Sequence, residues 1–170
     1  GVQTCALPIL IGVRKGDRLI NMDSQIPNKV VEEWLRAGNL FLEPVAVRPE
    51  TTYGNSRFDF YVESGETKAF IEVKGVTLEE DGVVRFPDAP SERAVKHVEE
   101  LIRAKKEGYD AYVFLVIQMK GVRYFTPNMD TQPEFGEVLK KAKAAGVKIL
   151  AYDCQVTEDS IKIVKKFRLY

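Results

Sequence analysis

The chain has 170 residues, 45% of them hydrophobic, which is enough apolar material for one buried core and at most a small appendage. Lysine plus arginine and aspartate plus glutamate both count 25, so the net charge of zero excludes a uniformly basic, nucleic-acid-coating surface. No apolar run approaches the roughly 20 residues of a membrane helix, and Cys5 and Cys154 have no metal-binding spacing. We therefore expect a cytoplasmic protein without a membrane partner.

The amino-terminal part of the sequence divides into two short segments. Residues 1–9 begin without methionine and look like an artefactual, non-native segment, so we draw no function from them. Residues 10–27 contain one predicted strand and a glycine turn between Leu10 and Asp23, too little to form a domain. We expect the main domain to span residues 28–170.

Beyond this point the sequence alternates between helical and strand periodicity. Asn28 is the predicted N-cap of a helix that Gly38 ends, and a loop is predicted over residues 49–55. A second helix is capped by Ser91 or Asp88. The predicted helices cover residues 29–37, 90–107 and 134–145, and the strands cover residues 40–47, 57–62, 69–73, 111–119, 147–152 and 160–170. This order predicts an α/β fold in which helices flank a mixed sheet.

Two of these strands carry acidic side chains in apolar surroundings. Asp59 lies between two phenylalanines, and Glu72 and Lys74 follow two positions apart, so they share one face of a strand. If the two strands pair as a hairpin, Asp59 approaches Glu72. The two carboxylates, joined by the carbonyl of Val73, would form an oxygen site suited to Mg²⁺, with Mn²⁺ as an alternative. Lys74 would hold or deprotonate the attacking water, or stabilise charge on the scissile phosphate.

The simpler interpretation is that Glu72 and Lys74 form a surface ion pair, worth at most about 1 kcal/mol. Glu-x-Lys alone is a weak motif. Its context is more specific: an isolated acid on one strand, then a turn, then Glu-x-Lys inside an apolar strand, all preceded by a helix. We therefore favour a nuclease-type site over a decorative ion pair.

Three sequence blocks in a fixed order carry a family resemblance: YGNSRFDF at 53–60, IEVKGVTL at 71–78, and FPDAPSER at 86–93, followed by His97. Over residues 10–170 the chain resembles the sugar fermentation stimulation (SfsA) family. That resemblance implies a PD-(D/E)xK nuclease-like domain after an OB-like domain, of which residues 10–27 would be the remnant. It also implies a DNA-binding protein linked to the expression of sugar-metabolism genes.

By this resemblance the Asp-Glu-Lys set occupies the nuclease-core positions. Glu33 on the first helix matches an additional acidic residue of the metal site, although its neighbour Glu32 competes with it. Glu50 lies at a position that the family pattern favours, and we expect it to contact the metal ligands without binding the metal itself.

The third block gathers charged residues around the start of a helix. Helix amino termini attract phosphate, and Arg93 and His97 are four residues apart, so both face the same side. The predicted nucleic-acid contacts are Arg57, Arg93, Lys96 and His97. Asp88 and Glu92 are expected to support them. The alternative is that Asp88 and Ser91 cap the helix, Glu92 pairs with Lys96, and His97 is a partly exposed helix residue.

The sequence thus predicts an α/β restriction-endonuclease-like domain, an αβββαβ core with an additional helix and strands, that binds DNA and hydrolyses phosphodiesters with Mg²⁺. One alternative is a DNA-binding regulator that does not cut. Another is that the Asp-Glu-Lys set binds only a metal or a small phosphate ligand. The expected partners are DNA and a divalent metal, and a homodimer stays open.

Overall fold

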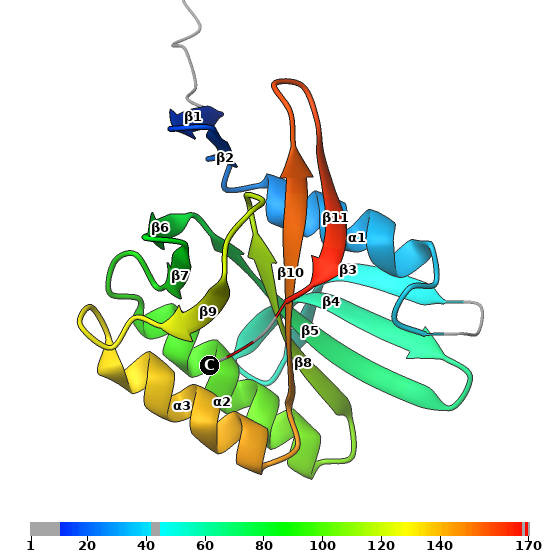
Figure 1. Ribbon diagram of the computed structural model, residues 1–170. Coiled ribbons are helices and arrows are strands. Elements are labelled where there is room, and N and C mark those ends of the chain that lie inside the picture. The colour runs from blue at the N-terminus through cyan, green and yellow to red at the C-terminus, as the bar shows by residue number, and fades with distance from the viewer. Residues whose placement is uncertain (1–10, 42–44, 168, 170) are drawn as a thin grey trace, which may run out of the picture.

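The computed structural model describes residues 11–41, 45–167 and 169, and Figure 1 shows its elements. A six-stranded mixed sheet forms the centre of the molecule, in the order β11-β10-β8-β5-β4-β3. Its strands are β3 (Ala46–Tyr53), β4 (Ser56–Ser64), β5 (Thr67–Val76), β8 (Asp110–Ile117), β10 (Lys148–Val156) and β11 (Ile161–Lys166). Strands β5, β8 and β10 run parallel, whereas β3, β4 and β11 pair antiparallel with their neighbours.

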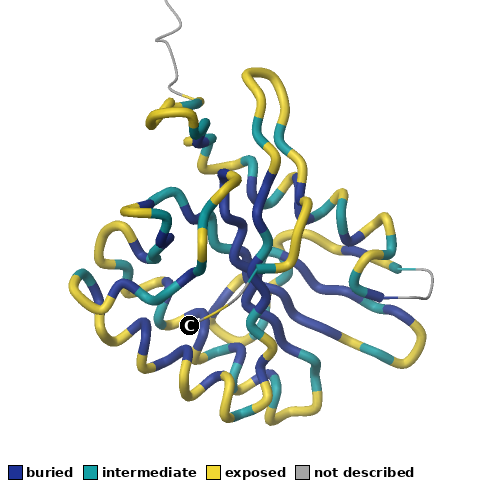
Figure 2. The backbone as a smooth tube through the Cα atoms, in the orientation of Figure 1, coloured by how far each residue is buried: buried dark blue, intermediate teal, exposed yellow. Residues whose placement is uncertain are grey.

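Helices cover both faces of this sheet (Figure 1). They are α1 (Ile26–Arg36), α2 (Glu92–Lys106) and α3 (Pro133–Ala144). Alternate residues of β8 enter two separate cores: Val113 and Leu115 pack with α2 and α3, whereas Phe114 packs with α1. Every residue of β8 after Asp110 is therefore buried, which explains its nearly unbroken apolar sequence (Figure 2). The predicted α/β architecture, with its αβββαβ core, is confirmed.

Two smaller sheets lie outside the central one. An antiparallel hairpin precedes α1, and a three-stranded sheet lies beside α2 and α3 (Figure 1). Their strands are β1 (Gly12–Lys15), β2 (Arg18–Asn21), β6 (Leu78–Glu80), β7 (Val83–Phe86) and β9 (Tyr124–Pro127). The sequence prediction missed β6, β7 and β9, which are only three or four residues long, and it assigned one strand where β1 and β2 form two. No helix in the described ranges is long and apolar enough to cross a membrane.

Two boundaries differ from the prediction near the site. The residues from Pro49 to Tyr53 belong to β3 and are not a loop. Since β3 is an edge strand, a proline that cannot donate a hydrogen bond is tolerated there. The predicted strand over residues 40–47 includes residues 42–44, which lie outside the described ranges. Helix α1 begins at Ile26, after Gln25 as N-cap and with Pro27 in its first turn, so Asn28 is not the cap.

The start of α1 lies very close to β5. A β-carbon on Gly75 would be 2.4 Å from Oε1 of Gln118 and 2.8 Å from Cγ of Pro27, so only glycine fits between them. The buried Gln118 side chain in turn donates to the carbonyls of Asn21 and Asp23, just before α1. The first turn of α1 is thus held against the strand that carries Glu-x-Lys.

Candidate metal centre

The site forms where β4 separates from β5. Their antiparallel pairing runs from Ser64 and Thr67 to Phe60 and Ile71 and ends there. At the next position, Oδ2 of Asp59 accepts the backbone N–H of Val73 at 2.7 Å. The carboxylate therefore takes the place that a strand carbonyl would fill. Since the N–H and C=O groups of one residue point to the same side of a strand, the Val73 carbonyl faces the same gap.

A change of face in β4 aims Asp59 into this gap. Phe58 packs in the core beneath α2 and α3, whereas Phe60 packs in the core beneath α1. Residues two apart on a regular strand share a face, so the strand must turn at Asp59. On the neighbouring strand β3, Glu50 adopts a positive φ of 54° between the pairs Pro49–Phe60 and Thr51–Phe58. The irregular backbone of β3 at Glu50 therefore lies beside Asp59 of β4.

The second oxygen of Asp59 is held by α1. Nδ2 of Asn28 donates to Oδ1 of Asp59 at 2.8 Å. Sequence reasoning missed this residue because it assigned Asn28 to the helix cap. Pro27 was the available signal, because proline is favoured in the first turn of a helix and places the helix start before Asn28.

Glu72 is almost fully buried, with 2% of its surface exposed. Its Oε1 contacts Nζ of Lys74 at 2.6 Å and Nδ1 of His97 at 2.5 Å. Its Oε2 is buried, and within the described part of the chain it has no hydrogen-bond partner. A buried carboxylate oxygen without a partner is costly, so Oε2 marks a position where positive charge is favoured. As predicted, Glu72 and Lys74 share a face, and Asp59 lies beside them.

The pKa values of the two carboxyl groups shift in opposite directions. Burial and then the charge of Glu72 raise the pKa of Asp59, against the opposing hydrogen bonds from Val73 and Asn28. Burial would also raise the pKa of Glu72, but the hydrogen bond from His97 and the charge of Lys74 outweigh it, and the net shift is downward. The negative charge of Glu72 thus opposes ionisation of Asp59. A cation between the two would relieve this repulsion.

These donors fit a hard cation better than a transition metal. Asp59 and Glu72 offer carboxylate oxygens and Val73 a carbonyl oxygen, the ligands that Mg²⁺ and Ca²⁺ prefer. Among the residues that the structure describes, no three His, Cys, Asp or Glu side chains gather closely enough to hold a metal. With so few protein ligands, a bound ion would keep several waters, which leaves room for a phosphate group.

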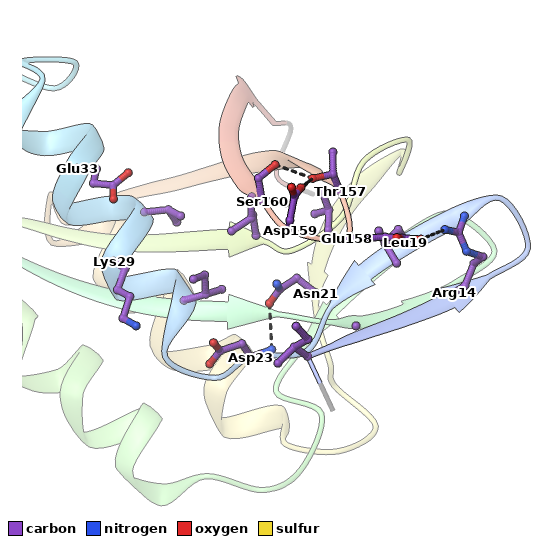
Figure 3. A pocket seen from close by; sticks show the side chains of 16 residues that line it. Arg14, Leu19, Asn21, Asp23, Lys29, Glu33, Thr157, Glu158, Asp159 and Ser160 are labelled. Carbon is purple, nitrogen blue, oxygen red and sulfur yellow. Dashed lines mark hydrogen bonds and ion pairs between the residues drawn. The ribbon is translucent and has the colours of Figure 1, made fainter. Parts of the chain in front are cut away.

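Glu33 lies apart from this pair of carboxylates. It is exposed and lines a hollow of about 650 Å³ between α1, the β1–β2 hairpin and the turn between β10 and β11 (Figure 3). Asn28 and Glu33 are five positions apart, so about 140° of helix rotation separates them. Asn28 reaches Asp59, which leaves Glu33 on a different face. The neighbouring Glu32 instead pairs with Arg36 at 2.6 Å.

Six further predicted residues are exposed on the surface. Glu50 pairs with Arg57 at 2.8 Å, and both side chains are more than half exposed. Arg93 is exposed at the start of α2, and the exposed Lys96 donates to the carbonyl of Asn55 at 3.1 Å. The other residues of the third block that the sequence analysis assigned to supporting roles, Asp88 and Glu92, are both exposed.

Two expectations for the start of α2 need revision in detail. Of the two proposed caps, Ser91 is the one used, since its Oγ accepts the N–H of Ala94 at 3.2 Å. The second concerns His97, predicted to reach a DNA phosphate. Its side chain is 6% exposed and contacts Glu72 inside the protein. This burial leaves Arg93 without the histidine as a surface partner.

Taken together, a helix, three antiparallel strands, a helix and a parallel strand, with an acid on the second strand and Glu-x-Lys on the third, define an α/β restriction-endonuclease-like domain. The chain matches the family model of the sugar fermentation stimulation protein RE domain, SfsA, over residues 25–160. It belongs to the SfsA family.

Individual relatives agree with this assignment. The chain is 64% identical over 154 residues to a sugar fermentation stimulation protein homolog of Clostridium beijerinckii, covering 91% of this chain and 68% of that protein. It is 62% identical to a homolog from Desulfitobacterium hafniense, covering 90% and 67%. Among solved structures, the SfsA of Pyrococcus furiosus in complex with Ca²⁺ matches with a TM-score of 0.87 and 27% identity, covering 95% of this chain and 71% of that one.

Proposed function

We propose that this protein binds DNA and hydrolyses its phosphodiester backbone with Mg²⁺, for which Mn²⁺ can substitute. The ion would be held by Asp59, Glu72 and the carbonyl of Val73. The observation that carries the proposal is the buried, unpartnered Oε2 of Glu72 beside a second carboxylate. A site that only stabilised the fold would have no need for a second carboxylate whose charge opposes the first.

When bound, Mg²⁺ supplies Lewis-acid polarisation of the scissile phosphate and lowers the pKa of its bound water. The protein side chains do the rest. Asn28 and the Val73 N–H fix the Asp59 carboxylate, so it need not reorganise when the ion arrives. Nζ of Lys74 lies 2.6 Å from Glu72 and uses one of its three donors there, which leaves donors for the attacking water or a phosphate oxygen.

Two further points support the proposal. The P. furiosus SfsA was crystallised with Ca²⁺, a cation that prefers the same oxygen ligands as Mg²⁺. Arg57, Arg93 and Lys96 are exposed cations on β4 and α2, the elements that carry Asp59 and His97. Such side chains neutralise backbone phosphates without reading sequence, and they can do so although the net charge of the chain is zero.

The direct test is a magnesium titration with plasmid and single-stranded DNA. We expect nicking that requires Mg²⁺, is lost in Glu72→Gln and Lys74→Ala, and is retained in Glu33→Gln, which alters an acid outside the gap. Calcium should bind and compete without supporting cleavage. Loss of nicking in Glu33→Gln, with Glu72→Gln still active, would show that Glu33 and not Glu72 belongs to the catalytic site. No cleavage by the wild-type protein at any Mg²⁺ concentration would refute the proposed hydrolysis.

The second candidate is a DNA-binding regulator of sugar-metabolism genes that does not cut. The observation favouring it is that, among the described residues, no third His, Cys, Asp or Glu side chain joins Asp59 and Glu72 in a metal-binding group, and Glu33 lines a different hollow; this suits a weak cation site. DNA retention in a gel-shift assay, without cleavage at any Mg²⁺ concentration, is its expected signature. If Asp59, Glu72 and Lys74 serve only a metal or a small phosphate, neither retention nor cleavage should occur.

A further inference from the structure

Glu72 presents its two oxygens to very different surroundings. Oε1 receives two contacts, from Lys74 and from His97, whereas Oε2 is buried and unpartnered within the described residues. One oxygen is therefore occupied by the protein and the other is left for a ligand. The carboxylate must be held against partial rotation, because any intermediate torsion angle would turn the free oxygen away from the ligand position.

The two groups that hold Oε1 differ in rigidity. Lys74 extends from the same strand on a flexible four-carbon chain, and its side chain is 13% exposed. His97 comes from α2 and has a short, planar side chain that is 6% exposed. Its ring packs edge-on against Phe58, with 6.2 Å between ring centroids and 77° between planes. The histidine is thus fixed by the packing of α2 against β4 and β5.

Of these two groups, Lys74 is the one with a second role in the proposed function. In the proposed function Lys74 contacts the attacking water or a phosphate oxygen, and turning toward either stretches its 2.6 Å contact with Glu72. Once Lys74 turns away, His97 is the remaining contact of Oε1 among those described. No phosphate contact is available to the histidine from its buried position.

We infer that His97 is a positioning residue: through Nδ1 it holds Oε1 of Glu72, so that Oε2 stays aimed at the cation while Lys74 is released to the reaction. The inference rests on the proposed function for the role of Lys74, but its effect on the cation site does not require cleavage. Mutation of a residue that hydrogen-bonds a metal ligand, without binding the metal itself, typically lowers metal affinity by about 10–100-fold.

The experiment compares three variants by isothermal titration with Ca²⁺ and by Mg²⁺-dependent plasmid cleavage. His97→Leu removes both ring nitrogens and keeps apolar bulk. His97→Asn keeps a polar group near the position of Nδ1. Leu101→Ala removes bulk from the same buried face of α2 without altering a contact of Glu72, and it serves as the stability control.

We expect His97→Leu to weaken Ca²⁺ binding by about 10–100-fold and to lower kcat, with KM for DNA little changed. His97→Asn should recover most of both. Leu101→Ala should lower the melting temperature but leave Ca²⁺ affinity at the wild-type value.

Wild-type Ca²⁺ affinity in His97→Leu would overturn the inference, as would an equal loss of affinity in Leu101→Ala, because the effect would then come from stability alone. A raised KM with unchanged kcat in His97→Leu would also overturn it, and would return the histidine to DNA binding. If the wild-type protein binds Ca²⁺ but does not cleave DNA, the proposed hydrolysis fails, while the affinity series still decides the role of His97. If it binds no Ca²⁺ or Mg²⁺, both fail.

Discussion

Gly75→Ala tests how closely α1 must approach β5 for the site to form. A β-carbon at this position would lie 2.8 Å from Cγ of Pro27, whereas carbon atoms in contact prefer about 3.5–4.0 Å, so the ring must retreat by roughly 1 Å. The proline ring cannot rotate away, since it is part of the first turn of α1. The helix itself must therefore move, and it carries Asn28 away from Asp59.

The magnitude follows from two opposing effects. Overpacking of this kind costs about 1–3 kcal/mol, and replacing glycine returns about 0.4–1 kcal/mol by restricting the unfolded chain. From the middle of each range the net loss is about 1.3 kcal/mol, which corresponds to a melting temperature lower by about 3–5 °C for a domain of this size. Displacing Asn28 should also weaken Ca²⁺ binding.

Differential scanning calorimetry with and without Ca²⁺ measures both effects. Gly12→Ala is the matched control, because a β-carbon there meets only ordinary contacts, at 3.6 Å from the carbonyl oxygen of Ile20 and 3.7 Å from a Leu19 methyl group. Equal melting temperatures and equal stabilisation by Ca²⁺ in the two variants would refute the close-approach argument.

Three further changes probe other parts of the account. Asn28→Ala should lower Ca²⁺ affinity by about 10-fold or more, because Asp59 loses the hydrogen bond that Asn28 donates. An unchanged Ca²⁺ affinity in a calorimetric titration would contradict this. Ser91→Ala should cost about 1 kcal/mol in urea unfolding through loss of the α2 cap, with no change in Ca²⁺ affinity.

Glu79→Gln concerns the junction between β1–β2 and β6, where Lys15, Arg18 and the N–H of Gly82 hold the pKa of Glu79 below its usual 4.5. A depressed folded pKa contributes stability above about 4.5 that is lost as the pH falls through the folded value. The wild type should therefore lose stability more steeply than Glu79→Gln in this acid range, as followed by urea unfolding; identical slopes would contradict it.

How much of the site the sequence predicts depends on how far apart along the chain the contacting residues lie. Glu72 and Lys74 share a face because of strand periodicity, which is local, so their pairing was predictable. The approach of Asp59 to the Glu-x-Lys strand followed from the short turn that joins β4 to β5, since such a turn gives antiparallel pairing. The SfsA blocks added the family, which no single motif specified.

The contacts that sequence reasoning missed come from distant elements. His97 reaches Glu72 across 25 positions, and its burial depends on how α2 packs on the sheet rather than on helix periodicity alone. Asn28 reaches Asp59 only because Gly75 allows α1 to approach β5. Which of Asn28, Glu32 and Glu33 faces Asp59 could not be decided from the sequence, because the helix start at Ile26 was not known. In each case tertiary packing determined which polar side chain faces the gap.

The central claim is that a divalent cation binds between Asp59 and Glu72. An anomalous diffraction experiment on crystals soaked with Mn²⁺ tests it most directly. We expect a peak within about 2.0–2.6 Å of Oε2 of Glu72 and of an Asp59 oxygen. An empty gap with the peak in the hollow beside Glu33, or no ordered Mn²⁺ at all, would contradict it.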